Sequence, residues 1–175
     1  MSSVVELVAD VMTARQAVLR QVASLTTAQT AQKPSEEEWS VAEIIEHLVL
    51  AEHMGVRKIW QAADSAGTEG AFEESSNAGL SIEEVIAGTW KTREQAPPEA
   101  TPSGEGSLDY WTACFRACQP VLEELGARLE GVELSTVIFP HFLCGPLDAR
   151  QRLEFLRFHI ERHGRQIERL TARNE

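Results

Sequence analysis

Apolar side chains recur at three- and four-residue steps along four long stretches of the chain. This spacing places them on one face of an α-helix, which completes a turn about every 3.6 residues. The inward face of the first stretch includes Val11 and Val18, and that of the last includes Leu156 and Ile160. The pattern predicts four amphipathic helices, at about 3–25, 41–63, 108–129 and 147–172.

Polar residues mark where several predicted helices begin. Ser40 and Glu43 stand in the S-x-x-E relation of a capping box, in which each side chain bonds the backbone N–H of the other residue. Ser81 and Glu84 repeat this relation and predict a further, short helix that ends near residue 90. Ser107 is placed to cap the third long helix.

The segments between the helices predict connections rather than a sheet. Residues 64–80 and 97–106 are rich in Gly, Ser, Pro or acidic residues, as surface connections are. Residues 131–146 are predicted to be irregular, because no segment there, VELSTVIF at 132–139 included, alternates for long enough. The prediction is an all-α fold: a four-helix bundle with a long crossover between helices two and three, forming one domain over residues 1–175.

Composition narrows the range of partners. The 175 residues include 27 acidic and 16 basic side chains, a formal net charge of -11, without a Lys/Arg run. Such a chain repels phosphate backbones and anionic lipid, so nucleic acid and membrane surfaces are excluded as expected partners. No stretch reaches the roughly 20 apolar residues of a membrane span, and the N-terminus does not resemble a signal peptide. We therefore expect a cytoplasmic protein.

Three of the five histidines are spaced as metal ligands would be. His159 and His163 are four residues apart, so their imidazoles lie one above the other on the last predicted helix. His47 lies on the inward stripe of the second helix. If these helices face each other, the three residues converge as neutral nitrogen ligands and leave a coordination position open for water or substrate. On the residues alone, the alternative is a set of hydrogen-bonded core histidines.

The other histidines predict different roles. His53 follows His47 by about 240° around the helix axis and is expected at the surface. His141 lies in the loop before the last helix, where it is either a structural hydrogen-bonding residue or part of a segment that folds back over the site. Glu43 is one turn before His47 and either orients its imidazole or only caps the helix.

The three cysteines are predicted to be thiols, because an odd number in a reducing compartment does not form a complete disulfide set. Cys114 and Cys118 are four residues apart and could in principle ligate zinc. They lie beside an apolar stripe, where cysteine usually acts as a small hydrophobic residue. Cys144 is predicted to be an isolated thiol in a loop.

Two segments resemble a known family. WSVAEIIEHLVLAE at 39–52 carries a tryptophan, a small residue and an E-x3-H spacing, which matches the first ligand of that family at His47. PHFLCGPLDARQRLEFLRFHIERHGRQIERL at 140–170 carries H-x3-H followed by Gln-Ile, which matches the remaining ligands at His159 and His163. On these motifs the chain resembles the DinB-like (DinB/YfiT) superfamily of four-helix metal-binding proteins.

The resemblance implies a bundle that binds a divalent ion, often zinc or nickel, and that is frequently a homodimer. Characterised relatives include S-transferases and isomerases that use low-molecular-weight thiols such as bacillithiol or mycothiol, and others were proposed to be metal-dependent hydrolases. The ion would lower the pKa of a bound thiol or water in either case. We therefore expect a metal-dependent thiol S-transferase acting on a small-molecule substrate. The alternatives are a metal-dependent hydrolase and a non-enzymatic, metal-stabilised interaction or sensing protein.

Overall fold

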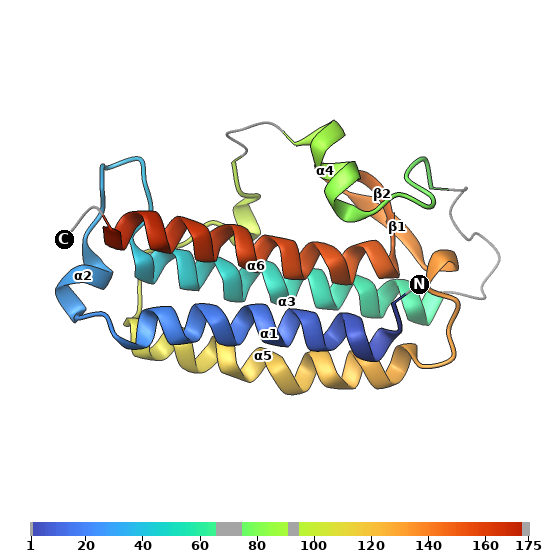
Figure 1. Ribbon diagram of the computed structural model, residues 1–175, viewed down its shortest axis with the longest axis horizontal. Helices are drawn as coiled ribbons and strands as arrows, with labels where there is room; N and C mark the ends of the chain where they lie inside the picture. Colours follow the sequence, from blue (N-terminus) through green and yellow to red (C-terminus); the bar gives the residue numbers. More distant parts are fainter. Residues whose placement is uncertain (1, 66–74, 91–94, 173–175) are drawn as a thin grey trace.

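Long helices lying side by side dominate the computed structural model (Figure 1), which describes residues 2–65, 75–90 and 95–172. The mainly helical class predicted from the sequence is confirmed. The long helices in the described part of the chain are α1 (Val4–Ala23), α3 (Val41–Ser65), α5 (Leu108–Leu129) and α6 (Ala149–Ala172). A short helix, α2 (Thr27–Ala31), lies between α1 and α3 in the sequence.

Each long helix contacts two others, since α6 packs against α1 and α3, and α5 packs against the same two helices. The sequence colours in Figure 1 show that α3 and α5 run in the same direction, opposite to α1 and α6. The chain between α3 and α5 therefore returns to the end at which α3 begins. It carries α4 (Ile82–Thr89) and a short 3-10 helix, η1 (Pro98–Ala100). Most of the connection predicted at 64–80 lies outside the described residues.

The predicted helix starts are confirmed by hydrogen bonds. The Ser40 N–H donates to Glu43 Oε2 at 2.8 Å, and the Glu43 N–H donates to Ser40 Oγ at 3.2 Å. Ser81 caps α4 with the same reciprocal pair of bonds, made with Glu84. The Ser107 hydroxyl accepts from the third N–H of α5. These caps satisfy backbone donors that a helix leaves free in its first turn.

The inward stripes of the four long helices form the main core, which includes the fully buried Val11, Ile44, Phe115, Leu122 and Leu153. One ion pair lies inside this core among the described residues, between Arg15 of α1 and Glu52 of α3. Both side chains are at most 2% exposed. Arg15 Nε, Arg15 Nη1 and Glu52 Oε2 have no hydrogen-bond partner in the described part of the chain, so this pair is incompletely satisfied there.

The segment predicted to be irregular contains a β-hairpin, which is a correction to the sequence prediction. Strand β1 (Ile138–His141) pairs antiparallel with β2 (Gly145–Asp148), and a 3-10 helix, η2 (Leu134–Thr136), precedes it. Pro140 pairs with Pro146, and neither residue has an N–H to donate to the partner strand. Because proline is uncommon inside strands, the sequence of this hairpin does not indicate a sheet. Tertiary bonds compensate, since Asn77 Nδ2 donates to the carbonyl oxygens of Cys144 and Pro146.

The hairpin and α4 close over one end of α6 (Figure 1). They share a second, smaller core with Phe155 and Phe158 of α6, made of buried residues from both elements. These residues are Ile82, Val85, Cys144 and Leu147. None of the described helices combines the length and the apolar character that crossing a membrane requires.

Candidate metal centre

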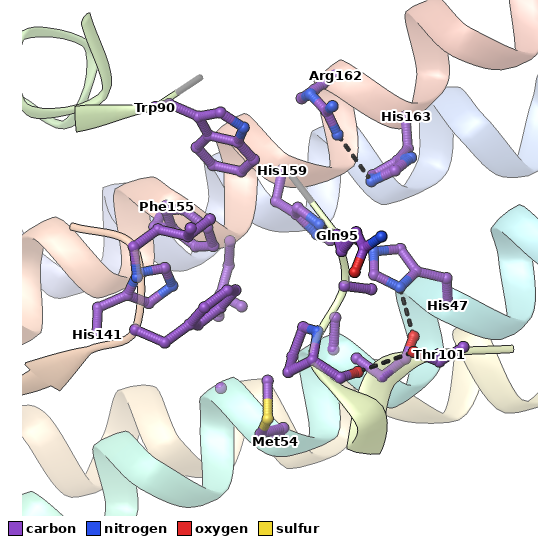
Figure 2. A pocket seen from close by; sticks show the side chains of 18 of the residues that line it. His47, Met54, Trp90, Gln95, Thr101, His141, Phe155, His159, Arg162 and His163 are labelled. Carbon is purple, nitrogen blue, oxygen red and sulfur yellow. Dashed lines mark hydrogen bonds between the residues drawn. The ribbon is translucent and has the colours of Figure 1, made fainter. Parts of the chain in front are cut away.

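The structure brings His47 of α3 together with His159 and His163 of α6, and Figure 2 shows their rings turned toward one another. The Nε2 atoms of His47 and His159 are 3.1 Å apart. One ligand nitrogen from each of the three residues lies within 4.8 Å of the others. The ligand groups of all three residues are buried, although His159 as a whole residue is partly exposed.

This arrangement fits a single metal ion. Tetrahedral zinc binds imidazole nitrogen at about 2.0–2.1 Å, which places two ligand nitrogens about 3.3 Å apart. The observed 3.1 Å between His47 and His159 is close to this spacing, and the third nitrogen lies within 4.8 Å of both. Three protein ligands leave a fourth tetrahedral position for an outside molecule, as in catalytic rather than structural sites.

Two of the three imidazoles are fixed by a bond on the nitrogen that faces away from the cluster. His47 Nδ1 donates to the carbonyl oxygen of Ala100 at 2.6 Å, which leaves the lone pair of its Nε2 free. His163 Nδ1 donates to Gln166 Oε1 at 2.9 Å with the same result. The connection that carries Ala100 is itself held to α3, because the Glu46 carboxylate accepts the N–H and hydroxyl of Ser103 at 2.7 Å each.

His159 is the adjustable member of the cluster. Because His47 Nε2 is an acceptor, the 3.1 Å contact requires a proton on His159 Nε2, which donates to it. Among the described residues His159 has no other hydrogen bond, so its proton can move to Nδ1 when Nε2 binds an ion. In the third ligand, His163, the lone pair of Nε2 already accepts a hydrogen bond from Arg162 Nη1 at 3.3 Å. An ion at this point must displace that guanidinium.

The surroundings keep all three imidazoles neutral. Burial is the main cause that lowers the pKa of His47, and the nearby Arg162 lowers it further. Burial followed by the neighbouring imidazoles lowers the pKa of His159, and burial followed by His47 lowers that of His163. A neutral imidazole is the form that binds a metal ion, so the cluster does not need to lose protons at physiological pH.

The cluster lies at one end of a cavity of about 520 Å³. Its walls come from α3, from the connection before α5, from the hairpin turn and from α6. Figure 2 shows His141 and Phe155 to one side of the cavity, with His47 and His163 to the other. Most of the wall is apolar or aromatic, and the volume is that of a site for a small organic molecule.

His141 fulfils both roles that the sequence left open. It is buried, lines the cavity, and its Nδ1 accepts the N–H groups of Leu143 and Cys144 in the hairpin turn at 3.3 and 3.2 Å. Its neutral ring therefore carries its proton on Nε2, which has no partner among the described residues. Burial, with Arg152 and Lys58 nearby, lowers the pKa of His141 to about 3.

The remaining candidates do not join the cluster. His53 is exposed, as predicted. Glu43 binds the backbone of Ser40 and the ammonium of Lys33 rather than His47. Cys118 is buried, its thiol donates to the Cys114 carbonyl oxygen at 3.4 Å, and burial raises its pKa to about 12. All three cysteines are free thiols.

Two cavity residues were not identified from the sequence although a signal was present. Arg152, Leu156, His159 and His163 follow the spacing of one face of α6, so a charged residue on this inward stripe indicates a site. Lys58 stands in the same relation to His47 on α3. The Ala100 carbonyl has no sequence signal, because a backbone acceptor is present at every residue.

Comparison with known proteins supports the family resemblance that the motifs at 39–52 and 140–170 indicated. The sequence model of the DinB superfamily matches residues 12–167. The chain belongs to the DinB superfamily. No curated protein and no solved structure matches it. The match includes the three histidines of the cluster, together with the connection and the hairpin that wall the cavity.

Proposed function

We propose that this DinB superfamily protein is a metal-dependent enzyme of the thiol S-transferase type. His47, His159 and His163 would hold one divalent ion, zinc or nickel, on a bundle of four helices with a crossover between α3 and α5. The observation that carries the proposal is the convergence of three neutral imidazoles at the end of a cavity of about 520 Å³. A purely structural metal site would be closed by a fourth protein ligand instead.

The ion, when bound, lowers the pKa of a thiol that reaches it, so that thiolate is available near neutral pH. The chain's own groups prepare the site for this chemistry. The Ala100 carbonyl and Gln166 Oε1 hold the outer protons of His47 and His163, so that both present Nε2. Once released from His163, the Arg162 guanidinium stays beside the site, where its positive charge favours an incoming anion such as a thiolate.

The cavity next to the cluster could hold the electrophilic small molecule to which the thiol is transferred. Its largely aromatic and aliphatic wall offers an apolar surface to an electrophilic small molecule, with which the thiolate would form a bond while the leaving group departs with the electron pair of the bond that breaks. The protein would work in the cytoplasm, where low-molecular-weight thiols are reduced. A homodimer, which the family resemblance implies, is proposed with it, and light scattering of the purified protein tests that part.

The first test is the metal content. Tag-free protein is loaded with zinc or nickel, desalted and analysed by elemental mass spectrometry, and we expect about one equivalent per chain. A His47→Ala variant should retain far less, whereas His53→Ala on the exposed face of the same helix should match the wild type. Less than about a tenth of an equivalent in the wild type would refute the proposal.

The second test separates the reaction types. The metal-loaded protein is assayed with cysteine as thiol and 1-chloro-2,4-dinitrobenzene as electrophile, and separately with p-nitrophenyl acetate in the absence of thiol. Metal-dependent turnover in the first assay is expected. Turnover in the ester assay alone identifies a hydrolase, and tight metal binding without turnover in either favours the non-enzymatic alternative.

A further inference from the structure

The far end of the cavity from the histidine cluster is positively charged, although the chain as a whole has a net charge of -11. Arg152 of α6 and Lys58 of α3 both line it. Neither makes an ion pair with a carboxylate among the described residues. In a chain with 27 acidic side chains, two neighbouring cations left without a counter-ion indicate that an outside anion pairs with them.

Arg152 carries this argument because it is only 5% exposed. Its Nη2 donates to the carbonyl oxygens of Pro140 at 2.5 Å and Phe139 at 3.4 Å, and its Nε has no hydrogen-bond partner among residues 2–65, 75–90 and 95–172. Its guanidinium lies 3.9 Å from the centre of the Phe139 ring. Burial lowers the pKa of Arg152 to about 9. A buried cation without a counter-ion is costly, and a bound anion would relieve that cost.

His141 adds a neutral donor at the same end. Its Nδ1 already accepts from the N–H groups of Leu143 and Cys144, so its Nε2–H remains for a ligand. The same bonds use up two N–H groups of the hairpin turn that a phosphate would need as donors. With those N–H groups occupied, the donors that remain are two cations and one imidazole N–H, which the two acceptor oxygens of a carboxylate can satisfy.

Helix geometry places the two ends of the cavity at a defined separation. Arg152 precedes His159 by two turns of α6, so their Cα atoms are about 10 Å apart along the helix. Lys58 follows His47 by three turns of α3, which corresponds to about 16 Å. Because α3 and α6 are antiparallel, both cations lie toward the same end of the cavity and both helices place a histidine at the other.

We propose that the substrate is an elongated molecule whose reacting atom lies at the histidine cluster and whose far end is a carboxylate bound by Arg152, Lys58 and His141. The intervening part is apolar, matching Phe155 and Leu156 of the cavity wall. This inference rests on the proposed function for the reacting end only. The carboxylate end depends on residues that do not contact the cluster.

The test uses mercapto acids as probes. Cobalt-loaded protein is titrated with 6-mercaptohexanoate, 3-mercaptopropanoate and the amide of each acid, and binding is followed by the thiolate–cobalt absorbance. The six-carbon acid spans roughly the separation of the two ends and should bind about tenfold more tightly than its amide. The three-carbon acid is too short to reach Arg152, so it should lose this advantage over its own amide.

Variants assign the effect to the proposed residues. Lys58→Met removes a cation that makes no hydrogen bond in the described structure, and it should abolish most of the difference between the six-carbon acid and its amide. Arg57→Met makes the same charge change at the next residue, which is exposed and outside this cavity, and should leave the difference unchanged. Arg152→Lys, which keeps the charge but shortens the fork, should weaken acid binding and leave amide binding intact.

The outcomes separate the two proposals. Equal binding of acid and amide by the wild type, or equal losses in the Lys58 and Arg57 variants, overturns the carboxylate end and leaves the metal centre standing. If no thiol perturbs the cobalt spectrum, the proposed function fails. In that case hexanoate and hexanamide are compared by thermal shift on metal-free protein, where stabilisation by hexanoate that Lys58→Met removes still supports the carboxylate end.

Discussion

Replacing His141 by Asn should make the protein markedly less sensitive to mild acid. The pKa of His141 is lowered from 6.5 to about 3, mainly by burial and then by the charge of Arg152. Between these values the unfolded chain binds more protons than the folded protein, so the free energy of unfolding falls as the pH decreases through this window. Above pH 6.5 none of this stability is lost. Because pH 5 lies about 1.5 pH units below 6.5, the free energy of unfolding is lower there by about 2 kcal/mol.

Asn is chosen because its Oδ1 can accept the N–H groups of Leu143 and Cys144 in place of His141 Nδ1, while it does not titrate. Urea unfolding of both metal-free proteins is measured at pH 7 and pH 5 in EDTA. The wild type should lose about 2 kcal/mol more than the variant, which corresponds to about 4–8 °C in Tm. His53→Asn at the exposed histidine of α3 is the control. If His141→Asn loses as much stability as the wild type, the buried neutral imidazole is not the cause.

Four further predictions concern the cluster and the core. Arg162→Met should tighten zinc binding about three- to tenfold in competition with a chelating dye, because it removes a charge and a competing donor; unchanged or weaker binding contradicts this. Gln166→Leu should weaken zinc binding about 10- to 100-fold in the same assay, because it removes the outer partner of an imidazole; equal affinity would show that the partner is dispensable. Glu52→Gln should lower the free energy of unfolding by about 3–5 kcal/mol, and combining Arg15→Met with Glu52→Leu should restore most of it; a double variant as unstable as the single one would point to packing instead. Cys118 should resist iodoacetamide at pH 8 in the native protein and react in urea, because burial raises its pKa to about 12. Labelling is measured by mass spectrometry, and modification of Cys118 in the native protein contradicts this prediction.

The sequence predicted the helices and the pairing of His159 with His163 because both depend on local periodicity. Ser40, Ser81 and Ser107 cap helices where the capping patterns indicated. His159 and His163 share a face of α6 because they are one turn apart, and this holds in any helix. His47 required the further condition that α3 pack against α6, and the resemblance to the DinB-like superfamily supplied it.

Features that depend on tertiary contacts were beyond sequence patterns. The hairpin pairs Pro140 with Pro146, so its strands resemble loop, and bonds from Asn77, more than sixty residues earlier, stabilise it. Arg15 and Glu52 form a buried pair that joins two helices, although a single charged residue in a sequence is normally predicted to be exposed. In each case the stabilising partner is distant in the sequence, so no local pattern records it.

The division between helices and connections has a consequence for how this protein can evolve. The three imidazoles stand on long helices, whereas part of the cavity wall comes from residues 95–101 and from the hairpin turn. The group that connects the two is the carbonyl oxygen of Ala100, which accepts from His47 and which any residue at position 100 would also carry. Substitutions of exposed residues in these segments would therefore reshape the cavity without removing the acceptor that fixes His47.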